Sequence, residues 1–194
     1  KSQQNIVIDT TRKELLVKIA NKIAANYYNG NVNINFICTH NSRRSQLGQV
    51  WSFFAADYFN LPINAFSGGT EVTAFHRNTV KTLTEVGFKF DIVEFSHTNP
   101  TYRIFFSDDK PFLVGFSKLY DHPENKTPYF VLTTCNNADE NCPFIPEAIE
   151  RFHVPYIDPK HSDDTDSQDE TYLKTSEIIA AQMYYLFNKV KTLL

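Results

Sequence analysis

The residues best suited to chemistry stand in one stretch, Cys38-Thr39-His40-Asn41-Ser42-Arg43-Arg44-Ser45. Cys38 and Arg44 are separated by five residues, a spacing that suits a tight loop around an oxyanion. Backbone N–H groups and the N-terminus of a following helix attract such an anion, and Arg44 adds two parallel hydrogen bonds. The same positive field favours the thiolate form of Cys38, which is the nucleophilic form.

The remaining loop residues have more general roles. Asn41 suits a left-handed backbone position. Ser45 either caps the following helix or hydrogen-bonds the Cys38 sulfur. Four other members of the loop are expected to contribute amide groups to oxyanion binding: Thr39, His40, Ser42 and Arg43. The side chains of His40 and Arg43 could simply face solvent. The competing interpretation of Cys38, a small buried hydrophobic side chain, is disfavoured by the arginine six positions later.

The elements that must position this loop flank it directly. The apolar run Val32 to Ile37 predicts a strand before it, and Gln46 to Phe59 predicts a helix after it. A second strand over Pro62 to Phe66 leads into a turn at Ser67 to Thr70, and His76 to Val86 predicts the next helix. Strands that alternate with helices indicate a parallel sheet with crossover helices.

Two segments depart from that alternation. Thr10 to Tyr28 predicts an amphipathic helix that starts at a cap on Thr10 or Thr11, ends near Gly30 and packs on the core, with a partner-binding role as the alternative. Phe88 to Tyr129 holds three strand-like runs, which we interpret as an inserted antiparallel arm: Phe90–Phe95, Tyr102–Phe106 and Phe112–Phe116.

A second thiol follows a further strand. Tyr129 to Thr134 predicts a core strand that ends at Cys135, on the same side of the sheet as Cys38. Cys142 lies seven positions beyond Cys135, which is about 10 Å along a helix and too far for a disulfide unless the segment unwinds or is a loop. A thiol relay, two unrelated buried cysteines and a metal site remain three alternatives, the last without the usual ligand spacing.

The totals restrict the class of protein. A chain of 194 residues with net charge −3 suits one domain and gives no electrostatic case for binding nucleic acid or an anionic membrane. No apolar run is long enough to cross a bilayer, and no signal peptide is recognised. Three cysteines suit reduced thiols rather than a fixed disulfide framework. We therefore expect a cytoplasmic protein without a nucleic-acid or membrane partner.

The pattern C-x-x-N-x-x-R-S at Cys38 to Ser45 resembles the signature of the low-molecular-weight protein tyrosine phosphatases and of the thioredoxin-coupled arsenate reductases built on the same fold. The C-x6-C-P segment at Cys135 to Pro143 resembles the redox loop of those reductases, and the ordinary phosphatases lack this pair. The resemblance implies that Cys135 and Cys142 are the second and third cysteines of a relay. Reductases of this type usually carry Gly where His40 stands and Cys where Arg43 stands.

The resemblance also implies a proton donor and a fold. In both families an Asp-Pro pair in a late loop carries the acid, which assigns this role to Asp158, although a plain turn aspartate is the alternative. Ser67 is a second candidate near the nucleophile loop, against an ordinary turn serine. We treat the following acidic run, Asp163 to Asp166, as solvated surface. Thr171 to Leu193 predicts a final helix with an apolar face toward the sheet: Leu173, Ile178, Ile179, Met183, Leu186, Phe187 and Val190.

The implied fold is an α/β three-layer sandwich with a four-stranded parallel sheet, in one domain over 1–194. An N-terminal helical extension (1–31) and an antiparallel β arm (88–129) would be additions to it. No bound cofactor or metal is expected, because an external thioredoxin or similar thiol would supply electrons.

Three functions compete. In the first, Cys38, Cys135 and Cys142 reduce arsenate to arsenite. In the second, Cys38, Arg44 and Asp158 hydrolyse a phosphomonoester through a phosphocysteine, and the other two cysteines only protect the nucleophile. In the third, the loop holds an oxyanion without turnover, and the arm binds a protein.

Overall fold

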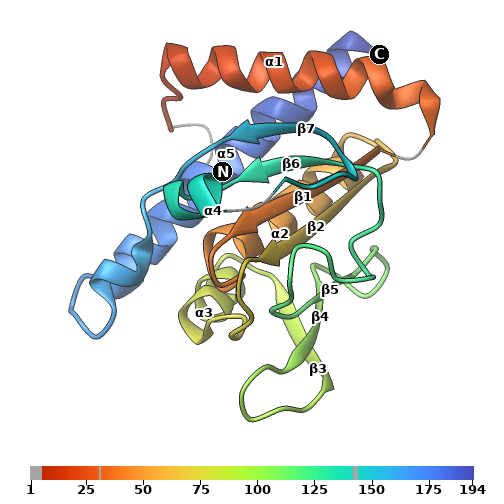
Figure 1. Ribbon diagram of the computed structural model, residues 1–194. Coiled ribbons are helices and arrows are strands. Elements are labelled where there is room, and N and C mark those ends of the chain that lie inside the picture. Colours follow the sequence, from red (N-terminus) through yellow and green to blue (C-terminus); the bar gives the residue numbers. More distant parts are fainter. Residues whose placement is uncertain (1–5, 31, 142–143) are drawn as a thin grey trace.

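A four-stranded parallel sheet forms the centre of the molecule. The computed structural model describes residues 6–30, 32–141 and 144–194. The sheet has the order β2-β1-β6-β7 (Figure 1) and contains these strands: β1 (Val32–Cys38), β2 (Ile63–Gly69), β6 (Tyr129–Thr133) and β7 (Ala148–His153).

Strand β1 lies inside this sheet, and all seven of its residues are buried. Two of them are asparagines, which must find hydrogen-bond partners when they lose contact with water. The Asn33 amide donates to the carbonyl oxygen of Pro128 at 3.0 Å, and the Asn35 amide donates to that of Tyr120 at 3.0 Å. Burial on both faces explains why apolar residues or Cys38 occupy the other five positions of this strand.

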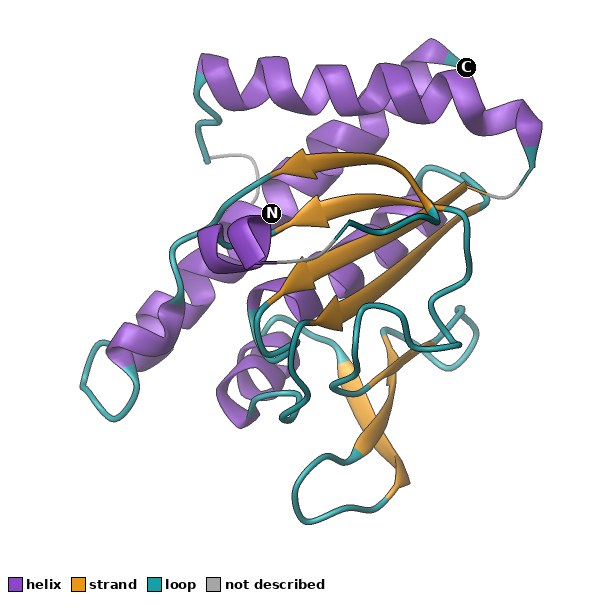
Figure 2. Ribbon diagram, in the orientation of Figure 1, coloured by secondary structure: helices purple, strands orange, loops and turns teal. Residues whose placement is uncertain are grey.

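Helices cover the two faces of the sheet unequally (Figure 2). The larger core joins the sheet to four helices: α1 (Thr10–Asn26), α2 (Arg44–Tyr58), α3 (Arg77–Glu85) and α5 (Gln168–Leu193). The smaller core contains Ile37, Cys38 and Cys135 and lies under the short helix α4 (Asn136–Asn141). These layers confirm the expected α/β sandwich.

Helix α1 packs on the larger core through buried residues at helical spacing: Leu16, Ile19, Ala20 and Ile23. The expected cap at Thr10 or Thr11 is wrong, because the Asp9 carboxylate accepts the first-turn N–H of Arg12 at 2.9 Å. A short 3-10 turn, η2 (Tyr27–Asn29), completes the segment and ends at Gly30, whose φ of 136° favours glycine.

The inserted arm is a separate antiparallel sheet below the main one in Figure 1. Its order is β3-β4-β5, with bounds Lys89–Glu94, Thr101–Phe105 and Leu113–Gly115. The three strand-like runs of the sequence are therefore confirmed. Ile104 and Leu113 of this sheet join the larger core, which attaches the arm to the domain.

Two details of the sequence interpretation are wrong. Strand β2 runs to Gly69, so Ser67 lies in a buried strand and not in a turn. In α5, Leu173 and Ile178 are only half-buried, whereas Tyr172 is fully buried. Helix α5 packs mainly on the neighbouring helices α2 and α1, and this contact selects a different face from the one expected.

Candidate active site

The loop between β1 and α2 is anchored through its carbonyl groups. The carbonyl oxygens of Cys38 and Thr39 accept the N–H groups of Thr70 and Glu71 at 3.3 and 2.8 Å. The Ser42 carbonyl accepts the N–H of His76 at 3.0 Å. The His40 carbonyl accepts the hydroxyl groups of Thr73 and Ser117. The Asn41 carbonyl accepts the Gln46 side-chain amide, and the Arg43 carbonyl accepts the Leu47 N–H. Every carbonyl from 38 to 43 therefore accepts a hydrogen bond from a residue outside the loop Cys38 to Ser45.

The amide N–H groups of residues 40–45 behave differently, since none donates to an acceptor among the described residues. Together with the N-terminal end of α2, these donors form a cradle for an anion. Asn41 has φ +45°, which confirms the left-handed position expected for it. The loop passes so close to Gly69 that a Cβ atom there would lie 2.7 Å from the Thr39 oxygen.

Cys38 lies at the base of this cradle and is 4% exposed. Its Sγ atom is 3.0 Å from the Ser45 Oγ atom. The Asn41 amide donates to the same Oγ at 2.9 Å, which leaves the Ser45 hydroxyl hydrogen available to the sulfur. Of the two roles considered for Ser45, the hydrogen bond to Cys38 is the one observed, because α2 begins at Arg44 and Arg43 occupies the cap position.

Two glutamines and a serine support the loop from behind. The Gln46 amide donates to the Asn41 and Phe116 carbonyl oxygens at 3.0 and 2.9 Å. The Ser67 hydroxyl donates to the Gln49 Oε1 atom at 2.6 Å and lies 3.4 Å from the Gln46 Oε1 atom. Ser67 is thus buried and reaches the loop through Gln46. The sequence reasoning missed both glutamines, although their i, i+3 spacing on one helix face was visible.

Arg44 and Asp158 form an ion pair in the lining of the hollow that lies above Cys38. One Arg44 terminal nitrogen donates to Asp158 Oδ2 at 2.5 Å, and the other donates to the Tyr156 carbonyl oxygen at 3.0 Å. The Arg44 Nε atom is buried and has no partner in the described part of the chain, so it is a free donor. The hollow is lined by Asp158 and by loop residues: Cys38, Thr39, His40, Ser42, Arg43 and Arg44.

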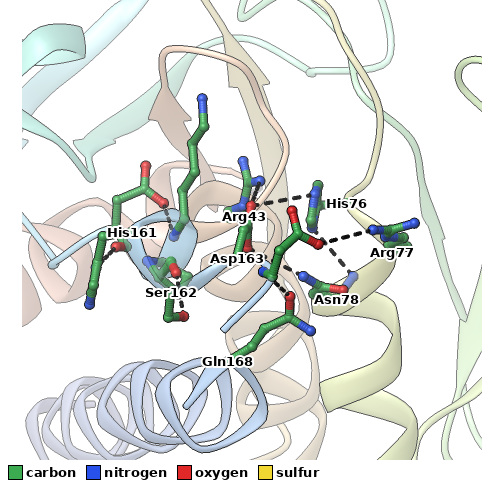
Figure 3. A network of polar contacts seen from close by, with 12 residues as sticks. Arg43, His76, Arg77, Asn78, His161, Ser162, Asp163 and Gln168 are labelled. Atoms are coloured by element: carbon green, nitrogen blue, oxygen red, sulfur yellow. Dashed lines mark hydrogen bonds and ion pairs between the residues drawn. The ribbon is translucent and has the colours of Figure 1, made fainter. Parts of the chain in front are cut away.

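The Arg43 guanidinium belongs to a polar cluster behind the loop (Figure 3). It donates to the Tyr172 hydroxyl oxygen at 2.6 Å and to Asp163 Oδ2 at 2.8 Å. Asp163 also accepts the Tyr172 hydroxyl at 2.6 Å and the Asn78 amide at 3.3 Å. The expectation that Asp163 is solvated surface is therefore wrong, because its carboxylate is mostly enclosed by α3 and α5.

This cluster shifts the pKa values of its members. Burial opposes ionisation of Asp163, but the Tyr172 hydrogen bond and the charges of Arg43 and His76 outweigh it and lower the pKa of Asp163. Burial and the hydrogen bond to Asp163 raise the pKa of Tyr172 to about 12. Burial, followed by the Arg43 charge, lowers the pKa of His76. At neutral pH the cluster thus holds one ion pair and a neutral imidazole.

The remaining loop side chain, His40, faces outward. Its Nε2 atom is 3.3 Å from Glu71 Oε2, and both side chains are exposed to solvent.

Comparison with known proteins identifies the family. No protein-family model matches the chain. An arsenate reductase of Staphylococcus aureus (strain Newman) is 30% identical over 128 residues, which cover 65% of this chain and 77% of that protein. An arsenate reductase of Bacillus subtilis (strain 168) is 30% identical over 135 residues, which cover 70% and 79%. The chain belongs to the arsenate reductase family.

Solved structures show which fold this arsenate reductase family member has. A low-molecular-weight protein tyrosine phosphatase from T. tengcongensis has a TM-score of 0.54 at 18% identity, covering 81% of this chain and 99% of that one. A phosphatase of the same class from Vibrio cholerae has a TM-score of 0.53 at 16% identity, covering 81% and 95%. The fold predicted from the Cys38 motif is thereby confirmed.

The second thiol lies beside the cradle. Cys135 is 4% exposed and is not disulfide-bonded, and its Sγ atom lies 3.6 Å from the Thr39 hydroxyl oxygen and 3.4 Å from the Ala138 nitrogen. Cys135, Thr39 and Arg44 also line an adjoining groove of about 530 Å³ that is open to solvent. The segment after Cys135 forms helix α4, and Cys142 lies outside the described residues.

Proposed function

We propose that this chain reduces arsenate to arsenite by a thiol relay, with Asp158 as proton donor. The observation that carries the proposal is the cradle: unbonded amide groups and the Arg44 Nε donor surround a hollow with a thiol at its base. A dianionic, tetrahedral oxyanion matches these donors in charge and shape. The family membership selects arsenate among such anions.

The first step forms a bond between sulfur and arsenic. The Cys38 thiolate attacks arsenic, and one arsenate oxygen departs as water after it receives the Asp158 proton. Ser45 stabilises the thiolate before the attack, since its hydroxyl is 3.0 Å from the sulfur. Arg44 and the loop amides hold the remaining oxygens. Arsenic is still pentavalent after this step.

The second step transfers the electrons. The Cys135 thiolate attacks Cys38, a disulfide forms, and the electron pair of the sulfur–arsenic bond stays on arsenic, which leaves as arsenite. The position of Cys135 beside Thr39 supports this handover. Cys142 then attacks Cys135 and releases Cys38, and an external thiol such as a thioredoxin reduces the Cys135–Cys142 disulfide. Reduced thiols of this kind fit a cytoplasmic location.

The test is arsenate-dependent oxidation of reduced thioredoxin by the purified chain. We expect steady turnover by the wild type and none by Cys38→Ser. Cys142→Ala should complete one turnover and accumulate a Cys38–Cys135 disulfide, which mass spectrometry of the alkylated protein would detect. Absence of turnover by the wild type would refute the proposal.

The same preparation should be assayed with p-nitrophenyl phosphate, because Cys38, Arg44 and Asp158 are also sufficient for phosphomonoester hydrolysis through a phosphocysteine. Hydrolysis that persists in a Cys135→Ala/Cys142→Ala double variant, combined with no arsenate turnover in the wild type, would favour the hydrolase.

A further inference from the structure

Arg12 stands in the first turn of α1, where a cation is out of place. The positive end of a helix dipole disfavours a guanidinium at this position. Asp9 satisfies the Arg12 backbone N–H but forms no ion pair with its side chain. In the ranges that the structure describes, no carboxylate pairs with the Arg12 guanidinium. Helix stability therefore gives no reason for an arginine here.

The Arg12 side chain is directed at the loop that leads to Asp158. One terminal nitrogen donates to the Pro155 carbonyl oxygen at 2.7 Å, and the guanidinium carbon lies 5.4 Å from the centre of the Tyr156 ring. The other terminal nitrogen is buried without a described partner. The Arg12 guanidinium has therefore exchanged part of its hydration for contacts with one short segment, residues 155–156.

Arg44, from helix α2, holds the same segment. It donates to the Tyr156 carbonyl oxygen at 3.0 Å and to Asp158 at 2.5 Å. The Tyr156 N–H donates to the Thr134 oxygen at 3.1 Å. Adjacent carbonyl groups, those of Pro155 and Tyr156, are thus bonded to arginines from two different helices, and the peptide group between these two residues is fixed at both its oxygen and its nitrogen.

We infer that Arg12 is a positioning residue for the proton donor, so that the N-terminal helix contributes to catalysis from outside the nucleophile loop. The inference rests on the proposed role of Asp158. Between Tyr156 and Asp158 the loop makes little packing contact of its own, since Ile157 is 79% exposed, whereas Pro159 beyond Asp158 is buried. With Arg12 removed, the Pro155 carbonyl is free to turn toward water, and Asp158 is held relative to the hollow only by Arg44 and by the Lys160 N–H that its carboxylate accepts.

The experiment compares Arg12→Met with Lys18→Met in the thioredoxin-coupled arsenate assay. Lys18 is the matched control, because it lies on the same helix and its ammonium group sits 5.8 Å from the Phe152 ring, away from the acid loop. Arg12→Met should lower kcat about tenfold with little change in the KM for arsenate, which is less than the roughly 100-fold loss associated with a 1 Å misplacement. Equal kcat values for the two variants would overturn the inference.

A double-mutant cycle separates positioning from general loosening. In an Asp158→Asn background, Arg12→Met should change kcat by less than about twofold, because the group that it positions is already gone. The same tenfold loss in both backgrounds would overturn the inference. Arg12→Lys, which keeps one donor and the charge, should recover part of kcat, and thermal unfolding of each variant checks that it folds.

The proposed function and this inference fail differently. No arsenate turnover by the wild type would refute the proposed function. Wild-type kcat in Asp158→Asn would show that the proton donor is misassigned, and the role of Arg12 would fall with it while the thiol relay would stand. Loss of kcat in Asp158→Asn together with an unaffected Arg12→Met would leave the proposed function standing and refute only the role of Arg12.

Discussion

Asp163 should stabilise the fold through its charge, and the structure allows the effect to be estimated. Asp163→Asn keeps the side-chain shape and an oxygen that can accept the Tyr172 hydroxyl, but it removes the negative charge beside Arg43. Breaking a fully buried ion pair costs about 3–5 kcal/mol. The side chains of Arg43 and Asp163 are 11% and 22% exposed, so solvent replaces part of the loss. We expect a decrease of about 2 kcal/mol in the free energy of unfolding, or a Tm lower by roughly 6 °C.

Urea denaturation at pH 7.5 measures this decrease. The pKa of Asp163 is lowered in the folded state, so its contribution is fully present above about pH 4 and is lost as the pH falls through the lowered value. The assay at pH 7.5 therefore records the whole contribution. Asp164→Asn is the matched control, because Asp164 is 87% exposed and lies 3.8 Å from an exposed Arg77, a surface pair worth less than about 1 kcal/mol. If Asp163→Asn and Asp164→Asn have equal free energies of unfolding, the stabilisation assigned to the Arg43–Asp163 ion pair is wrong.

Three further predictions follow from the loop and its surroundings. Ser45→Ala should reduce kcat for arsenate about 10- to 100-fold, because the Cys38 thiolate loses a charge-assisted hydrogen bond; unchanged steady-state kinetics would contradict this. Gly69→Ala should destabilise the protein by about 1–3 kcal/mol and impair turnover, since the new Cβ would lie 2.7 Å from the Thr39 oxygen, and urea denaturation with a parallel assay tests both effects. Stability of the wild type should decrease as the pH is lowered through about 6.5, the ordinary pKa of histidine, because His76 binds a proton more weakly in the folded than in the unfolded state; His76→Asn, which keeps a capping side chain, should flatten that part of the profile, and an equal slope would refute it.

Features that depend on neighbours along the chain could be predicted from the sequence. The loop from Cys38 to Ser45, the left-handed Asn41 and the three strands of the arm are fixed by residue types within a few positions of each other. The order of strands and helices then brought Cys135 to the same end of the sheet as Cys38.

Features that depend on distant segments could not be predicted. Asp163 appeared to be part of a solvated acidic run, because nothing nearby shows that Arg43 and Tyr172 enclose it. Gln46 appeared to be an ordinary helical residue, because one of its acceptors is Phe116, 70 positions away. Nothing near Arg12 in the sequence shows that its side chain reaches Pro155, 143 positions away. The third cysteine of the proposed relay, Cys142, lies outside the described residues and stays a prediction.

The anchoring of the Cys38 loop has a consequence for the order of events during folding. The His40 carbonyl and the Asn41 side chain are bonded to Ser117 and Lys118, each 77 positions further along the chain. Closing chain segments of this length is slow compared with forming a local turn. The thiol should therefore acquire its reactive surroundings only after the arm has docked, and a chain still leaving the ribosome would present Cys38 as an ordinary cysteine.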